Sequence, residues 1–235
     1  MAQIVVCFGD SITRGQISAN YVDLLKHRMV CDPLLFLNSG VNNDVTFNLL
    51  RRIRPVIAVD PQFITLMVGT NDVIASLSPY ASIFYYAQKR LPRWPALEWS
   101  INSLRKVVWR LKRGTRAIIA IASIPPLGEN LNTFPNQRVR AYNAAIQEIA
   151  DSEGLTYLPI FERLTAGLTH PGGREYKTDP LLLGEFIVKH FLFKESFDAF
   201  ARRKGFTLLT DGVHLNQFAA DLVALEIEGF LRTHL

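Results

Sequence analysis

The chain has 235 residues, of which 49% are hydrophobic and 20% are charged. These values predict a globular protein with a large apolar core, and we expect one domain spanning residues 1–235. No apolar run reaches the roughly 18 residues of a membrane-spanning helix. The first apolar run is cut by Gly9, which argues against a signal peptide. We therefore expect a cytoplasmic protein.

The net charge of +5 predicts an acidic partner or a solvated basic surface. The basic residues fall mostly on predicted helices whose other face is apolar, so we expect solvated helix faces and no nucleic-acid partner. Association with a membrane surface stays open. The two cysteines, Cys7 and Cys31, form no Cys-x-x-Cys motif. We expect both to be reduced, with no zinc site.

Strands and helices are predicted to alternate along the chain. Short apolar runs predict strands at 4–8, 34–37, 63–68, 116–122 and 155–159. Helical periodicity predicts helices at 19–29, 97–112, 136–153 and 217–231, and Asp44 is a candidate N-cap for another. Such alternation is typical of a parallel sheet that is covered by helices on both faces.

Two segments interrupt this alternation. Residues 77–95 are rich in aromatic residues and proline, and residues 165–209 contain a polar, glycine-rich loop. A helix is predicted from Asp179-Pro180 to about Lys204, with a wide apolar surface. That helix could cover an acyl pocket, form a dimer contact or belong to the core. We expect both segments to shape a substrate pocket, with Tyr80 and Phe84 as candidate substrate contacts.

Ser11 is the candidate nucleophile. It stands in Gly9-Asp10-Ser11, directly after the first predicted strand. Open α/β sheets carry their chemistry at the carboxyl ends of the strands. Gly-Asp-Ser taken alone is equally typical of an ordinary turn.

His214 is the candidate base, because it alone among the five histidines follows a carboxylate by three residues on a predicted loop. In a helical turn, residues at this spacing share one face. Asp211 can therefore contact Nδ1 of His214 and leave Nε2 free for Ser11. This arrangement suits a nucleophile, its base and the residue that orients the base.

Acyl transfer also requires donors to the developing oxyanion. Gly40 offers a backbone N–H and Asn71 a side-chain amide, and each follows a predicted strand. Parallel strands end at one edge of a sheet, so we expect Ser11, Gly40 and Asn71 to converge there.

At this point the sequence resembles the GDSL esterases and lipases, also called SGNH hydrolases. The matching residues are Ser11 in Gly-Asp-Ser-Ile-Thr, Gly40 after Leu-Asn-Ser, Asn71 in Gly-Thr-Asn-Asp and His214 in Asp-Gly-Val-His-Leu-Asn. The resemblance implies an α/β fold: a flavodoxin-like three-layer α/β/α sandwich whose five-stranded parallel sheet has the strand order 2-1-3-4-5.

The resemblance also implies roles for these residues. Ser11 would be the nucleophile, His214 the base and Asp211 its partner, with an oxyanion hole from the N–H groups of Ser11 and Gly40 and the side chain of Asn71. No cofactor and no metal are implied. Family members often carry a second glycine shortly after the first, where this chain has Asn43. We expect Asn43 to take the left-handed conformation, and we count Asn43 and Asp10 among the candidate substrate contacts.

The expected function is therefore cleavage of a small carboxylic ester that carries an acyl chain, by an esterase, lipase or lysophospholipase reaction through an acyl-enzyme. A carbohydrate O-acetyl esterase, a thioesterase and an acyltransferase are alternatives on the same site. Rival classes are a metal-dependent phosphoesterase built on Asp10, Asp72, Asp211 and His214, a binding module without activity, and a nucleic-acid-binding protein. The oligomeric state is not predicted.

Overall fold

One parallel sheet forms the centre of the protein. The computed structural model describes residues 2–168, 173–177, 184–186 and 188–235. The strands are β1 (Gln3–Gly9), β2 (Leu34–Gly40), β3 (Phe63–Met67), β4 (Ile118–Ala122) and β5 (Thr156–Leu158). Their order, β2-β1-β3-β4-β5, confirms the predicted topology.

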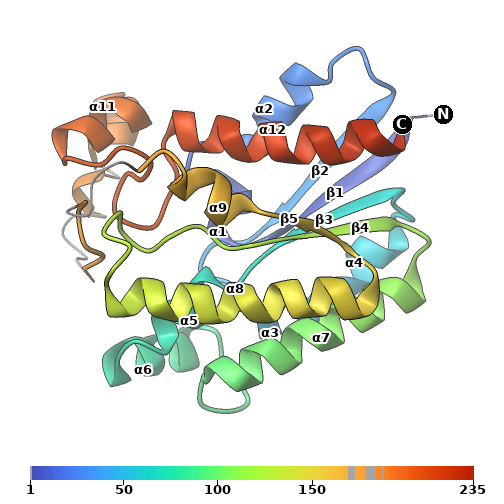
Figure 1. The fold of residues 1–235 in the computed structure, drawn as a ribbon, viewed down its shortest axis with the longest axis horizontal. Coiled ribbons are helices and arrows are strands. Elements are labelled where there is room, and N and C mark those ends of the chain that lie inside the picture. The colour runs from blue at the N-terminus through green and yellow to red at the C-terminus, as the bar shows by residue number, and fades with distance from the viewer. Residues whose placement is uncertain (1, 169–172, 178–183, 187) are drawn as a thin grey trace.

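Helices cover both faces of this sheet (Figure 1). They are α1 (Ser11–Arg14), α2 (Tyr21–Arg28), α3 (Thr46–Arg51), α4 (Ile53–Ala58), α5 (Thr70–Ala75), α6 (Pro79–Gln88), α7 (Leu97–Gly114), α8 (Phe134–Glu153), α9 (Ile160–Thr165), α11 (Phe197–Arg203) and α12 (Gln217–His234), with a π-helix at Val188–Leu192. Helices α2 and α12 lie on one face, and α3, α7 and α8 lie on the other (Figure 1).

Strand β1 shows why the strands could be predicted. Val5 and Cys7 pack in the core beneath α2 and α12, whereas Val6 and Phe8 pack in the core beneath α3, α7 and α8. Side chains alternate between the two faces of a strand, so a strand covered on both faces must be apolar throughout. No helix in the described ranges is both long enough and apolar enough to span a bilayer.

The turn after β1 requires glycine. A Cβ atom on Gly9 would lie 2.2 Å from Thr13 Oγ1 and 2.3 Å from the carbonyl oxygen of Met67. Gly9 pairs with Gly40 on β2 and with Met67 on β3, so these three strands end in register. The chain then turns at once into α1, where the Asp10 side chain caps the helix by accepting the N–H of Ile12 at 3.0 Å. Ser11 is thereby the first residue of α1.

Two local predictions were wrong. The helix predicted to reach Lys204 is interrupted, because Lys194 has a φ of 58° and the side chain of Ser196 caps a new helix, α11. Its predicted start at Asp179-Pro180 lies outside the described residues. Asp44 does not cap α3, whose N-cap is Val45. The Asp44 carboxylate instead pairs with Arg52 at 2.7 Å and Lys89 at 2.9 Å.

Candidate active site

The structure brings Ser11, His214 and Asp211 into one hydrogen-bonded chain. Ser11 Oγ lies 3.0 Å from His214 Nε2, and His214 Nδ1 lies 2.7 Å from Asp211 Oδ2. An ionised carboxylate can only accept, so Nδ1 carries the proton of the neutral ring and Nε2 accepts from the serine hydroxyl. Ser11 and His214 are only 3% and 7% exposed, respectively. The site therefore contains a serine hydroxyl that is shielded from solvent and hydrogen-bonded to the imidazole of His214.

The loop that carries Asp211 and His214 is closed by its own backbone. The N–H of Thr210 donates to the carbonyl of His214 at 2.8 Å, and Asp211 Oδ1 accepts the N–H groups of Val213 at 3.0 Å and His214 at 2.9 Å. One carboxylate oxygen thus shapes the turn while the other meets the imidazole. This is why a spacing of three residues suffices to orient the ring.

Contacts with other segments hold this loop against the segment between α1 and α2. The N–H of Leu215 donates to Ser18 Oγ at 3.0 Å, and the N–H of Ala19 donates to the carbonyl of Leu215 at 2.9 Å. The buried carboxylate of Glu129 accepts the N–H groups of residues 207–209, just before the loop. Sequence analysis did not identify Glu129, because nothing local distinguishes it from a surface glutamate.

Asp211 and His214 shift each other's pKa values against the effect of burial. Burial raises the pKa of Asp211. The charge of His214 and the hydrogen bonds that Asp211 accepts from the His214 ring and from the backbone outweigh burial, so the pKa of Asp211 lies below its usual value. Burial lowers the pKa of His214, but the charge of Asp211 and its hydrogen bond outweigh burial and raise it above 6.5. His214 is therefore a stronger base than an isolated histidine.

Asp10 is buried beside this pair. Burial raises the pKa of its carboxyl to about 7, against the lowering effects of the Ile12 N–H and of His214. The ionised Asp10 in turn raises the pKa of His214. Its buried side chain and cap hydrogen bond place it beneath the serine turn, and its expected role as a substrate contact stays a prediction.

Replacing Asp10 should shift the pH dependence of hydrolysis. In Asp10→Asn, the amide oxygen can still cap α1, but the negative charge near His214 is lost. The pKa of His214 then falls, so the acid limb of kcat/KM moves to lower pH. The profile should be measured from pH 5 to 9 beside Asp60→Asn, a surface replacement. An unmoved or alkaline-shifted limb would contradict this electrostatic coupling.

Asn71 lies at the start of α5, next to the serine turn at the same edge of the sheet. Its Nδ2 donates to the carbonyl of Asp44 at 3.0 Å, and its Oδ1 accepts the Tyr85 hydroxyl at 2.7 Å. The amide has two hydrogens on Nδ2, so one remains for a ligand. Asp72, beside it, accepts the N–H and the hydroxyl of Thr46 and thereby joins α5 to α3.

The N–H of Gly40 is already used within the protein. It donates to Asn38 Oδ1 at 3.0 Å, and a Cβ at Gly40 would lie 2.2 Å from the backbone nitrogen of Arg14. Gly40 is thus required for the close approach of β2 to α1, and its amide is not free for an oxyanion. Asn43 has a φ of 61°, the left-handed conformation expected for it. Its N–H has no hydrogen-bond acceptor in the described part of the chain.

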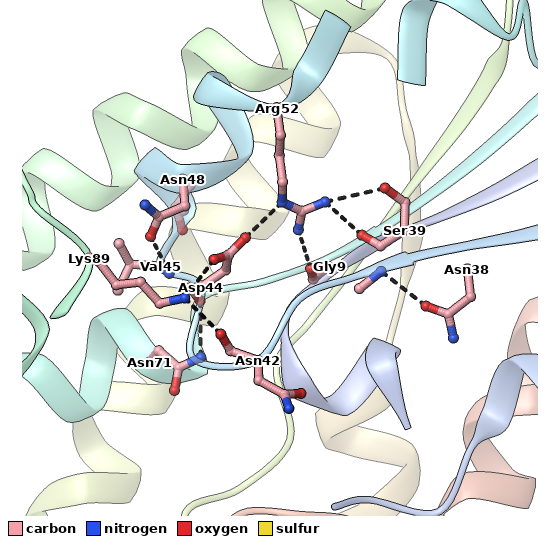
Figure 2. Close-up of polar contacts among 12 residues, drawn as sticks. Gly9, Asn38, Ser39, Asn42, Asp44, Val45, Asn48, Arg52, Asn71 and Lys89 are labelled. Carbon is pink, nitrogen blue, oxygen red and sulfur yellow. Dashed lines mark hydrogen bonds and ion pairs between the residues drawn. The ribbon is translucent and has the colours of Figure 1, made fainter. Parts of the chain in front are cut away.

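The other expected substrate contacts lie on α6. Tyr80 is 70% exposed and Phe84 is 45% exposed, whereas Tyr85 is buried. Sequence analysis did not identify Tyr85 or Lys89, although both contact residues at the site (Figure 2 shows Lys89). The aromatic richness of residues 77–95 was the only available signal, and it does not distinguish an inward tyrosine from an outward one.

The residues of the metal-dependent rival do not form a metal-binding group in the part of the chain that the structure describes. Across the described ranges, no group of three or more His, Cys, Asp or Glu side chains could hold a metal ion. Asp72 binds Thr46 and Asp211 binds His214, so these two carboxylates already have protein partners.

Comparisons with known proteins identify the family and the fold of the chain. The model of the GDSL-like Lipase/Acylhydrolase family matches residues 7–182, which include Ser11, Asn43 and Asn71 and end before Asp211. No curated protein matches the chain.

Solved structures of similar fold cover nearly the whole chain. The lipase/acylhydrolase from Enterococcus faecalis is 19% identical, with a TM-score of 0.66, and the match covers 99% of this chain and 97% of that chain. The acetylxylan esterase Axe2 from Geobacillus stearothermophilus is 16% identical, with a TM-score of 0.68, and the match covers 98% of this chain and 93% of that one. The acetyl xylan esterase AlAXEase is 16% identical, with a TM-score of 0.64 and coverages of 97% and 99%.

Proposed function

Since this chain belongs to the GDSL-like lipase/acylhydrolase family and is a carboxylic-ester hydrolase, we propose that it cleaves its substrate through Ser11, His214 and Asp211. The observation that carries this proposal is the pair of hydrogen bonds, 3.0 Å from Ser11 to His214 and 2.7 Å from His214 to Asp211. A buried hydroxyl that faces an oriented base is a nucleophile poised for acyl transfer.

The reaction has two steps. His214 Nε2 takes the proton of Ser11 as Oγ attacks the ester carbonyl, and the imidazolium then gives that proton to the departing alcohol. A water molecule repeats the attack on the acyl-enzyme and releases the acid and the free serine. Asp211 stabilises the imidazolium in both steps and holds its ring in place.

Three donors are available for the oxyanion. They are the N–H of Ser11, which starts α1 and has no intrahelical partner, the second Nδ2 hydrogen of Asn71, and the N–H of Asn43. Asn43 takes the role that the sequence resemblance implied for Gly40, because the N–H of Gly40 is bonded to Asn38.

Removing the side-chain donor should slow the chemical step. We expect Asn71→Ala to lower kcat by about 10²–10³ with little change in KM, since the missing hydrogen bond strengthens as charge develops on the oxygen. Steady-state kinetics on p-nitrophenyl acetate checks this, with Asn102→Ala on the surface of α7 as a control. A rise in KM at constant kcat would instead place Asn71 in ground-state binding.

The acyl group is the main open choice in the substrate. We propose an ester with a long acyl chain, because the described parts of residues 77–95 and 165–209 expose large apolar side chains, among them Ile83, Phe84, Phe191 and Leu192. A p-nitrophenyl ester series from acetate to dodecanoate tests this, and a matching thioester tests the thioesterase alternative. Preference for chains of about six carbons or more supports the proposal, and activity on acetate alone contradicts it.

A carbohydrate O-acetyl esterase is the second candidate. Two solved structures of the same fold are acetylxylan esterases, and Tyr80 and Phe84 expose aromatic rings that could stack on sugars. Release of acetate from acetylated xylo-oligosaccharides, faster than from p-nitrophenyl acetate, would favour this candidate. Replacing Tyr80 by Ala should then raise KM for the oligosaccharide and leave KM for the small ester unchanged.

A further inference from the structure

Two side chains from the end of α6 contact the residues that hold the oxyanion donors. The Tyr85 hydroxyl donates to Asn71 Oδ1 at 2.7 Å. Lys89, the C-cap of α6, donates from Nζ to the carbonyl of Asn42 at 2.7 Å and to Asp44 Oδ1 at 2.9 Å (Figure 2). Helix α6, which is an addition to the regular alternation of strands and helices, therefore lies directly behind the site.

Tyr85 determines how the Asn71 amide is turned. The phenol donates to Oδ1, and one hydrogen of Nδ2 is held by the carbonyl of Asp44. In a flipped amide, Oδ1 would face the carbonyl oxygen of Asp44 with no hydrogen between the two acceptors, and the hydrogen bond from Tyr85 to Oδ1 would be lost. The second Nδ2 hydrogen is therefore held in one direction. Burial raises the pKa of Tyr85 well above its ordinary value, so the phenol remains a donor throughout the working pH range.

Lys89 determines how the peptide between Asn42 and Asn43 is turned. In a trans peptide, the carbonyl and the following N–H point in opposite directions, and no cis peptide occurs in the described residues. The carbonyl of Asn42 faces Lys89, so the N–H of Asn43 faces away from it. In the view of Figure 2, Lys89 lies on one side of this loop and the violet ribbon of α1 lies on the other.

Helix α6 is itself fixed to the elements around the site. Ser82 Oγ donates to the carbonyl of Ala75, at the end of α5, at 2.6 Å. The guanidinium of Arg51, on α3, donates to the carbonyls of Lys89 at 3.0 Å and Arg90 at 2.8 Å. Tyr85 and Lys89 therefore keep a constant position relative to α5 and to the loop before α3.

We propose that Tyr85 and Lys89 are positioning residues of the oxyanion hole, Tyr85 acting through Asn71 and Lys89 acting through the Asn42–Asn43 peptide. This inference rests on the proposed function. It gives residues 77–95 a part in the rate of the chemical step, besides the substrate-pocket role expected from the sequence.

A double-mutant cycle tests the role of Tyr85. Tyr85→Phe keeps the ring and removes the hydroxyl, and we expect kcat to fall about tenfold to a hundredfold with KM unchanged. In the Asn71→Ala background the same replacement should change kcat less than twofold, because Tyr85 acts only through that amide. Tyr86→Phe, next to it on the same helix, is the matched control. Active sites are counted by fluorophosphonate titration, so loss of folded protein does not enter kcat.

A second variant tests Lys89 independently. Lys89→Met should lower kcat about tenfold with KM unchanged, and the loss should persist in Asn71→Ala, since the Asn43 N–H is a separate donor. Affinity for an alkyl trifluoromethyl ketone, which forms a tetrahedral adduct with a nucleophilic serine, should fall in parallel with kcat. Lys106→Met on the surface of α7 is the control.

The outcomes separate this inference from the proposed function. If Tyr85→Phe and Lys89→Met behave like their controls while activity still depends on Ser11, the positioning role is wrong and the nucleophile stands. A rise in KM alone would make both residues part of a substrate pocket and would overturn the inference. A Tyr85→Phe effect that is equally large without Asn71 would also overturn it. Activity that survives Ser11→Ala would instead refute the proposed function.

Discussion

Ser11→Ala should abolish ester turnover. Among the described residues, the Ser11 hydroxyl is the only hydrogen-bond partner of His214 Nε2, at 3.0 Å, and alanine removes it without disturbing the cap that Asp10 provides to α1. The variant loses the nucleophile and can retain only what the oxyanion donors and binding supply, so we expect kcat to fall by about 10⁶. p-Nitrophenyl acetate hydrolysis and labelling by a fluorophosphonate measure the loss.

The control for Ser11→Ala is Ser152→Ala, at the distant end of α8. That variant should label and turn over like the parent protein. Because the thermal unfolding midpoint of Ser11→Ala should stay close to that of the parent, the loss would report chemistry and not folding. Appreciable labelling or turnover by a folded Ser11→Ala protein would show that another residue is the nucleophile.

Asp211→Asn should cost nearly as much. The amide oxygen can still accept the N–H groups of Val213 and His214, so the loop keeps its shape. Its NH₂ group, however, now donates to Nδ1 of His214, which forces the ring proton onto Nε2. In this tautomer Nε2 can no longer accept the hydrogen of the Ser11 hydroxyl. We expect kcat to fall by about 10⁴, the usual effect of such a tautomer reversal.

The pH dependence of Asp211→Asn provides an independent check. The charge and hydrogen bond of Asp211 hold the pKa of His214 above 6.5 against burial. Without that charge the pKa falls, so the residual activity should persist to lower pH than in the parent protein. Asp221→Asn, on the surface of α12, is the control. Near-parental kcat in Asp211→Asn would mean that another group orients His214.

The free energy of unfolding should also depend on pH, through the carboxyl groups of Asp211 and Asp10. The pKa of Asp211 is lowered on folding, so its contribution is present above pH 3.8 and is lost as the pH falls through the lower native value. The raised pKa of Asp10, about 7, acts in the opposite sense, because the folded state then binds a proton that the unfolded state has released. Together, Asp211 and Asp10 therefore favour greatest stability of the folded state under mildly acidic conditions.

Local chemistry explains what could be predicted. The strands are buried on both faces and are short apolar runs for that reason, so their order along the chain is visible in the sequence. Asp211 and His214 are three residues apart and meet through one turn, and Ser11 follows the strand that ends in Gly9. These features depend on neighbours in the sequence, and the structure agrees with each of them.

Tertiary contacts decided the rest. Whether Gly40 or Asn43 offers a free N–H depends on where the side chain of Asn38 lies, because that side chain takes the Gly40 amide. Aspartate is a common helix cap, but Arg52, the C-cap of α3, and Lys89, 45 residues further along the chain, bind the Asp44 carboxylate instead. A helix cap and an ion pair contribute similar free energies to stability. Residue type alone therefore cannot tell which of the two interactions an aspartate will make.

Helix α6 shows the same division most clearly. Its aromatic composition was visible in the sequence, and so was its position beyond the third strand. The alternation of strands and helices follows from local periodicity, and the pairing of Asp211 with His214 follows from a three-residue spacing, so the sequence by itself determined both. The order of the strands and the link from Ser11 to His214 were implied by the resemblance to the GDSL esterases. Only the tertiary structure decided that Tyr85 points inward to Asn71 and that Lys89 reaches Asn42, because hydrogen bonds across the fold depend on how α6 packs against α5 and α3.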